Sequence, residues 1–278
     1  MKSNPSIKIS SILQHIILVM ATFLTLYPVL WVIKIALGPN QGLTTDLSLL
    51  PAEPTLDNFK VIIFDRPFFT WLYNSTIISL ATTIAGVILA CTAAYAFSRF
   101  RFPGRNTGLI SFLVTQMFPG TLMLIPLYLI LETLHLLDRN AGLVFVYSTT
   151  AIPFCVWMLK GYFDTIPKEL EEAARVDGAS ALKIFLTIML PLARPAIAVT
   201  ALFSFMTAWN EFILAATIMN SESAYTLPVG LQSMVGQFAS DWGYFAAGAI
   251  LVSLPVVALF FAFQKHLVSG LLAGSTKG

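Results

Sequence analysis

The sequence predicts an all-α membrane protein with six transmembrane helices and a short amphipathic helix on its charged side. Of the 278 residues, 57% are hydrophobic and only 11% are charged, and the mean hydropathy is +0.80. Soluble proteins contain about 25% charged residues. The apolar residues fall into stretches of about 20, the length that a helix needs to cross roughly 30 Å of hydrocarbon.

Six apolar stretches are expected to span the membrane: residues 13–37, 75–97, 109–131, 142–159, 196–218 and 245–263. The first stretch follows a tail that carries Lys2 and Lys8 and lacks a small-residue cleavage pattern, so we expect it to remain as an uncleaved helix. The expected organisation is a tail of residues 1–12, a membrane domain of residues 13–267 and a tail of residues 268–278.

Lysine and arginine are distributed unequally between the two sides of these spans. Cations near span ends are retained in the cytoplasm. With the N-terminus inside, the interior segments hold Lys2, Lys8, Arg99, Arg101, Arg105, Lys160, Lys168, Arg175, Lys183, Arg194, Lys265 and Lys277. The exterior segments keep Lys60, Arg66 and Arg139, with Lys34 at the outer end of the first span. The distribution predicts cytoplasmic termini. The net charge of +2 reflects this topology and does not indicate nucleic-acid binding.

The third span contains an unusual pair of helix breakers. Pro119-Gly120 is followed by Pro126, which predicts a helix interrupted twice and bent where it lines a path. The simpler alternative is that neighbouring helices satisfy the freed backbone groups, as they do for many prolines in membranes.

The fifth span contains an ionisable residue, Glu211, roughly 25 Å along a continuous helix from Arg194. A carboxyl at membrane depth usually faces the bundle interior or a wet cavity, which makes Glu211 a candidate for the path. Trp209 and Asn210 beside it suit a sugar, which is bound by an aromatic face and hydrogen bonds. A structurally paired carboxyl within an interfacial aromatic belt would contain the same residues.

The long polar interval between the fourth and fifth spans predicts two short helices. Thr165 is the expected N-cap of the first, acidic residues follow in its first turn, and Gly178 is placed to end it in a left-handed conformation. The second is expected over residues 181–190, before Pro191. The first helix has a narrow apolar stripe with small residues at its centre: Ile166, Leu170, Ala173 and Ala174. Such a stripe fits a cleft on a partner as well as it fits the protein's own bundle.

Residues for catalysis or metal binding do not converge in the sequence. Cys91 and Cys155 lie within spans and are expected to act as small apolar residues without a disulfide. The three histidines, His15, His135 and His266, are scattered without metal-ligand spacing. Because such residues do not converge, we expect neither a catalytic site nor a metal site in the chain. It also has no phosphate-binding loop G-x-x-x-x-G-K-[ST], so we expect no ATP hydrolysis by this chain.

The polar interval carries a family signature. Its residues match EAA-x3-G-x9-I-x-LP in full, and they are Glu172, Ala173, Ala174, Gly178, Ile188, Leu190 and Pro191. This signature resembles that of the membrane subunits of binding-protein-dependent ABC importers. The chain is also similar, over essentially its whole length, to the carbohydrate branch and its maltose/maltodextrin-type second permease subunits. That similarity is carried by the segments AYAFSR at 94–99, QMFP at 116–119, WNEF at 209–212, YTL at 225–227 and GLLAGSTKG at 270–278.

The resemblance implies a type I importer permease in a bacterial or archaeal plasma membrane, importing sugars or oligosaccharides. Residues 165–191 would form a cytoplasmic coupling loop that contacts an ATP-binding cassette ATPase dimer through the seven signature residues. That dimer would bind ATP and Mg²⁺. A second permease subunit would complete the pathway, for which the candidate residues are Pro119, Trp209, Asn210 and Glu211. An extracytoplasmic solute-binding protein would contact the last exterior loop, with Ser223, Tyr225 and Gln232 as candidates.

Two alternatives stay open at this point. The signature is shared with ABC permeases for phosphate, amino acids or metals. An ion-coupled secondary transporter would show paired charges at the membrane midplane and internal repeats, neither of which the sequence contains.

Overall fold

The computed structural model describes residues 5–39, 48, 51, 53–235 and 241–275. The predicted tails, residues 1–12 and 268–278, therefore lie partly outside the described residues. Within the described residues every regular element is helical, which confirms the predicted all-α class. The chain forms two compact units, one of residues 1–68 with 231–253 and one of residues 69–230 with 254–278.

Four described helices are long and apolar enough to cross a membrane. They are α1 (Pro5–Leu37), α3 (Phe68–Arg99), α6 (Asn140–Thr165) and α13 (Trp242–Ser275). Two bent helix pairs bring the number of candidate spans to six if each pair is counted as one span. The four long helices extend beyond the predicted apolar stretches, because a helix continues into polar residues wherever its backbone remains hydrogen-bonded.

The third predicted span is a bent pair. It consists of α4 (Arg105–Met117), the 3₁₀ turn η2 (Gly120–Met123) and α5 (Leu124–Thr133), and its two halves meet at 96°. Phe118 at the break is extended, as expected for a residue that precedes proline. The second interruption expected at Pro126 is wrong. Pro126 lies in the first turn of α5, where a missing backbone N–H costs little.

The fifth predicted span is also broken. It begins after α8 (Ala181–Ile184), the π-helical turn η3 (Phe185–Met189) and α9 (Leu190–Leu192), which meet α10 (Arg194–Trp209) at 76°. The second short helix thus continues past its expected end at residue 190 and through Pro191. The expected continuous helix over residues 196–218 is wrong, because α10 ends at Trp209 and α11 (Ile213–Ile218) starts after a turn.

The polar interval contains α7 (Glu169–Val176). Thr165, the expected N-cap, is instead the last residue of α6, where its hydroxyl donates to the carbonyl of Tyr162 at 2.7 Å. Lys168 precedes α7 and makes no side-chain cap. The prediction for Gly178 is confirmed, since it has a φ of +78° directly after the helix.

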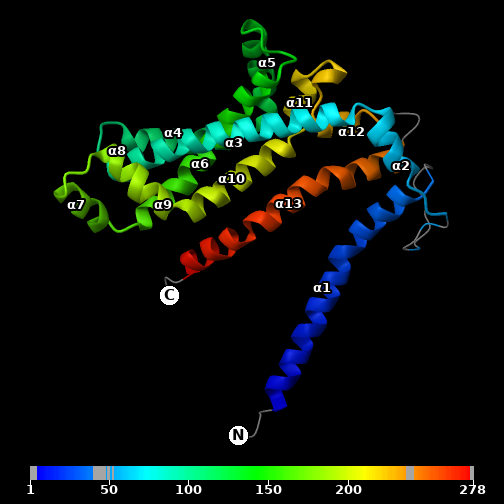
Figure 1. The fold of residues 1–278 in the computed structure, drawn as a ribbon, viewed down its shortest axis with the longest axis horizontal. Coiled ribbons are helices and arrows are strands. Elements are labelled where there is room, and N and C mark those ends of the chain that lie inside the picture. Colours follow the sequence, from blue (N-terminus) through cyan, green and yellow to red (C-terminus); the bar gives the residue numbers. More distant parts are fainter. Residues whose placement is uncertain (1–4, 40–47, 49–50, 52, 236–240, 276–278) are drawn as a thin grey trace. The chain divides into compact units, whose positions relative to one another are not determined.

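Within the second unit, two buried clusters lie toward the two ends of α3. The first, here called the inner cluster, joins α3, α6 and the segment from α8 to α9, and includes Ala94, Tyr95, Leu159, Phe163 and Met189. The second, the outer cluster, joins Ile78 of α3 to α5, α6 and α11. Figure 1 shows α7 and α8 beside the turn from α3 to α4, at the opposite end of α3 from α11.

The remaining short elements complete the chain. In the first unit they are α2 (Asp57–Lys60) and the π-helical turn η1 (Val61–Asp65). Asn58 of α2 is buried and donates to the carbonyls of Ala36 and Gly38, at 2.9 and 2.7 Å, so α2 is fastened to the end of α1. The 3₁₀ turn η4 (Glu222–Ala224) and α12 (Leu227–Gln232) follow α11.

Candidate functional site

The α7 helix is closed at its C-terminus by backbone hydrogen bonds alone. The N–H of Gly178 donates to the carbonyl of Arg175 at 3.0 Å, and the N–H of Ala179 donates to that of Ala174 at 2.9 Å. This pair of bonds is a Schellman motif, which requires a left-handed residue at the position of Gly178. Three acidic residues in the first turn and Arg175 in the last oppose the helix dipole favourably.

The signature residues divide into an exposed group and a packed group. Glu172, Ala173 and Gly178 are exposed. Ala174, Ile188 and Leu190 are partly buried against the inner cluster, and Pro191 is also partly buried. One part of the signature therefore anchors the segment to the bundle and the other part faces outward. Coupling by these residues stays a prediction.

A buried ion pair that the sequence analysis did not identify fastens α7 to α3. The Nε of Arg99 donates to Oε1 of Glu171, and the two side chains are 4% and 3% exposed. The hydroxyl of Tyr95 donates to Oε2 of Glu171 at 3.2 Å. Glu171 lies three residues before Ala174 and thus on the same helix face, which is the sequence signal that could have indicated its burial.

The ion pair continues into α6. Nη2 of Arg99 donates to the carbonyl of Ile166, directly after α6, at 2.8 Å. Nη1 of Arg99 donates to Oγ of Ser98, and Ser98 donates to Oδ1 of Asp164 at 2.6 Å. Lys160 donates to the other oxygen of Asp164 at 2.6 Å. Arg99 and Glu171 neutralise each other in the buried part of this network, as buried ionic groups require, whereas the side chains of Lys160 and Asp164 reach solvent.

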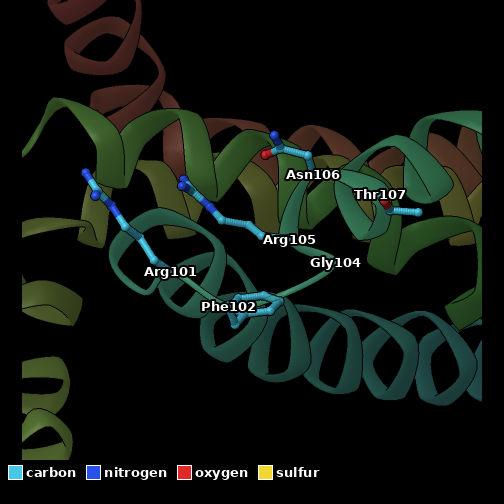
Figure 2. Close-up of a pocket in the computed structure, with 6 residues that line it drawn as sticks. All are labelled: Arg101, Phe102, Gly104, Arg105, Asn106 and Thr107. Carbon is cyan, nitrogen blue, oxygen red and sulfur yellow. The ribbon is translucent and has the colours of Figure 1, made fainter.

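A hollow of about 290 Å³ lies at the turn from α3 to α4. Figure 2 shows its lining residues, with the side chains of Arg101 and Arg105 extending to the same side. Arg105 donates through Nε to the carbonyl of Phe97 at 2.7 Å, and Gly104 has a φ of +83° just before α4. The lining is Arg101, Phe102, Gly104, Arg105, Asn106 and Thr107. This end of α3 is therefore cationic outside the neutral ion-pair network.

The opposite end of α3 holds the backbone of the last predicted exterior loop. Nδ2 of Asn74 donates to the carbonyls of Ser223 and Tyr225, at 2.9 and 3.0 Å. The indole N–H of Trp71 donates to the carbonyl of Glu222 at 3.1 Å, and Oγ of Ser75 accepts from the N–H of Leu227 at 2.7 Å. These bonds hold the loop in one conformation.

Asp138 adds a second anchor to the same loop. Its Oδ1 accepts from the backbone N–H groups of Asn220 and Ser221, at 2.9 and 3.0 Å. Partial burial opposes ionisation, but the hydrogen bonds from Ser221 and Asn220 outweigh it and hold the pKa of Asp138 below its ordinary value.

The candidate contact residues of this loop differ in exposure. Ser223 and Gln232 are exposed, whereas Tyr225 is partly buried against the outer cluster. Gln232 belongs to the first unit and Ser223 to the second. The predicted loop over residues 220–237 ends outside the described residues.

Glu211 organises the break in the fifth predicted span. Its Oε1 accepts from the N–H of Leu214 at 2.9 Å, and its Oε2 accepts from the N–H of Ala215 at 3.1 Å. The hydroxyl of Tyr147 donates to Oε2 at 2.7 Å. A carboxylate that satisfies the first N–H groups of a helix acts as its cap, so Glu211 starts α11. The sequence left open two interpretations of Glu211, a residue of the path and a structurally paired carboxyl. These hydrogen bonds are those of a structurally paired carboxyl.

The other candidate path residues have separate surroundings. Trp209 is 1% exposed and stacks on Phe205 with ring centroids 5.4 Å apart. Asn210 is exposed, and its amide donates to the carbonyl of Met206 at 2.8 Å. Pro119 is exposed at the break between α4 and η2. Trp209 and Asn210 flank the end of α10, whereas Pro119 lies on another bent pair.

Residues 82–272 match the family described as binding-protein-dependent transport system inner membrane component. The chain is 38% identical, over 95% of each chain, to the galactooligosaccharides transport system permease protein GanQ of Bacillus subtilis. It is 37% identical, over the full length of both chains, to the maltodextrin transport system permease protein MdxG of the same organism. Its fold is similar to that of a chain in a bacterial ABC transporter involved in the import of alginate. That likeness has a TM-score of 0.80 and 24% identity, and it covers 95% and 99% of the two chains.

Proposed function

Because the chain belongs to the family of binding-protein-dependent inner-membrane transport components, we propose that it is a permease subunit of an ATP-driven importer of sugars or oligosaccharides. The sugar class is supported by relatives named for the transport of galactooligosaccharides, maltodextrin and trehalose. Maltodextrins and related oligosaccharides are the first substrates to test.

The geometry of α7 is the observation that carries the coupling role. Glu172 and Ala173 face outward on a helix whose neighbouring Glu171 is buried in the bundle and whose end is closed by Gly178. A short helix held from one side and exposed on the other, with a small residue on its free face, fits a groove of a partner. The partner in this proposal is an ATPase dimer that binds ATP and Mg²⁺, and Glu172 pairs with one of its basic residues.

The chain supplies half of the pathway, and a second permease subunit supplies the other half. Two exposed residues at helix breaks contact the sugar directly in this proposal: Pro119, at the break between α4 and η2, and Asn210, in the turn between α10 and α11. Glu211 and Trp209 hold the break of the fifth span in shape. Helix breaks suit a path, because their free backbone groups are tolerated in a membrane only where protein or a water-filled cavity surrounds them.

The solute-binding protein contacts the last exterior loop through Ser223, Tyr225 and Gln232 in this proposal. Trp71 and Asn74 fasten the part of the loop that holds Ser223 and Tyr225 to α3, so at these two residues a partner meets a preformed surface. Preformed surfaces bind with a smaller entropic cost. Both termini are cytoplasmic in the same arrangement, following the distribution of lysine and arginine.

The test is uptake by the complete transporter in proteoliposomes. The chain is reconstituted with its second permease subunit, ATPase dimer and binding protein, and uptake of labelled malto-oligosaccharides, galacto-oligosaccharides and trehalose is measured. We expect uptake that requires ATP, stops when the phosphate-loop lysine of the ATPase is replaced and survives collapse of ion gradients by ionophores. Uptake confined to phosphate, amino acids or metals would refute the sugar assignment, and uptake abolished by ionophores would refute the ATP-driven mechanism.

A further inference from the structure

We propose that the buried ion pair of Arg99 and Glu171 makes α7 a rigid extension of α3 and α6, so that both residues are positioning residues for coupling. The inference rests on the proposed function, because it concerns how a force applied to α7 by an ATPase reaches the membrane helices. Arg99 and Glu171 lie outside the family signature, which contains neither of them.

The first argument is that α7 has little else to hold it. The helix has eight residues, and isolated helices shorter than about 12 residues are marginal in water. Its apolar side chains are largely in solvent, since Leu170 is 45% exposed and Val176 is 88% exposed. Ala174 alone among its apolar residues is partly buried against the inner cluster. The polar attachment through Glu171 therefore determines the orientation of α7.

The second argument is the geometry of the attachment. A guanidinium group presents its N–H donors in a fixed planar fork. Arg99 directs one donor to Glu171 on α7 and another to the carbonyl of Ile166 at the end of α6, while its own backbone terminates α3. Three helices are thus joined by one rigid group, with two sites of attachment on the segment from α6 to α7.

The third argument is that each partner is itself held in place. Both oxygens of Glu171 are occupied, one by Arg99 and the other by the hydroxyl of Tyr95. On the other side, Ser98 connects Arg99 to Asp164 of α6. A rotation of α7 would break bonds to a group that is almost completely shielded from water, where replacement by solvent is not available.

The adjacent acids then have different roles. Glu172 is exposed and available to a partner, whereas Glu171 connects the same turn of α7 to α3. A displacement at Glu172 reaches Arg99 through one peptide unit and one ion pair. Without the pair, α7 can tilt while α3 and α6 remain in place, and ATP is hydrolysed without transport.

The experiment uses the complete reconstituted transporter and four forms of this chain. Arg99→Leu/Glu171→Leu removes both charges and leaves no unpaired one, which protects folding. Glu171→Gln tests the acid alone, and Glu169→Gln is the control, because it removes an exposed acid from the same first turn of α7. We expect the double variant to retain the ATPase dimer on purification and to import at least fivefold less sugar per ATP hydrolysed. Glu169→Gln should match the unmodified chain.

A second readout follows the position of α7 itself and needs no transported substrate. Spin labels are placed at the exposed positions Val176 and Thr92, after Cys91 and Cys155 have been replaced by alanine, and their distance distribution is measured in the complex. We expect a narrow distribution that broadens in the double leucine variant and stays narrow in Glu169→Gln.

An unchanged distance distribution in the double variant would overturn the inference, and so would a broadened distribution with an unchanged ratio of sugar to ATP. Failure of the unmodified complex to import any sugar would count against the proposed function, while the spin-label distances would still decide whether the ion pair positions α7. A distribution that stays narrow in the single variant Glu171→Gln would also contradict the need for the charge.

Discussion

Replacement of Gly178 separates the closure of α7, which the structure shows, from the ATPase contact proposed for the same residue. The residue has a φ of +78°, and a Cβ built on it meets no atom of the chain within 4 Å. A side chain here therefore meets strain but no clash. A left-handed conformation costs a residue other than glycine about 1–2 kcal/mol, and asparagine tolerates it better than alanine. At about 1.4 kcal/mol for each factor of ten, Gly178→Ala should weaken the closed helix end roughly tenfold.

The size of the side chain should matter only where a partner covers the position. In the chain without its ATPase, Gly178→Leu should destabilise about as much as Gly178→Ala, and Gly178→Asn should destabilise less. In the assembled complex, side-chain volume should dominate, so retention of the ATPase should fall from glycine to alanine and then to asparagine and leucine. The assays are the apparent melting temperature of the permease subunits and the amount of ATPase that co-purifies at increasing salt.

The rank order expected for stability and the rank order expected for ATPase retention differ at asparagine. The asparagine variant therefore decides whether a partner covers Gly178. If Gly178→Asn retains the ATPase better than Gly178→Ala, then Gly178 acts through its backbone alone and is not covered by the partner. If Gly178→Leu melts at a far lower temperature than Gly178→Ala in the absence of the ATPase, then the space around Gly178 is not open within this chain.

Three further variants test other parts of the structure. Gly230→Ala should destabilise the chain by about 1–3 kcal/mol, because its Cβ would lie 2.3 Å from the Trp71 ring. In melting experiments, relief of this destabilisation by Trp71→Leu would support the clash. Equal melting temperatures of Gly230→Ala and the unmodified chain would exclude it. Glu211→Gln turns one acceptor into a donor that faces another donor and should cost about 1–3 kcal/mol. Additive effects with Tyr147→Phe in a double-mutant cycle would contradict the bond between the two. At pH above the ordinary aspartate pKa of 3.8, Asp138→Asn should lower the free energy of unfolding by less than about 1 kcal/mol. The difference in stability between the two proteins should vanish as pH falls through the lowered pKa of Asp138. A difference that grows toward acid pH would refute the role of the Asp138 carboxylate as an anchor of the loop.

The membrane explains why the helices could be predicted from the sequence. In hydrocarbon, backbone N–H and C=O groups must be satisfied within the segment, so a long apolar stretch is restricted to a helix. The breaks follow from local chemistry that hydropathy does not record. By hydropathy, Glu211 belongs to one continuous apolar stretch. Its carboxylate nevertheless accepts hydrogen bonds from the backbone N–H groups of Leu214 and Ala215 and so starts a new helix. The break at Phe118 and Pro119 could be predicted, because proline restricts the residue before it.

The candidate coupling site shows the same division between local and tertiary information. The turn at Gly178 could be predicted, because only the local backbone decides it. The distinction between Glu171 and Glu172 could not, because two identical adjacent side chains differ only in what surrounds them. The burial of Glu171 depends on Arg99, which lies 72 residues earlier in the chain. In the sequence, Arg99 can be recognised only as a cation near the end of a span.

The contacts at the two ends of α3 have a joint consequence. Ser75 at one end and Tyr95 at the other are separated by about 30 Å along a continuous helix, which is the thickness of the hydrocarbon layer. At one end Asn140 of α6 donates to Oδ1 of Asn74 at 3.2 Å, and at the other Ser98 donates to Asp164 at 2.6 Å. Because α3 and α6 are joined at both ends, sliding of either along the other would break both bonds. Relative movement within the second unit is therefore expected at the two bent pairs, whose breaks contain Pro119 and Ala193.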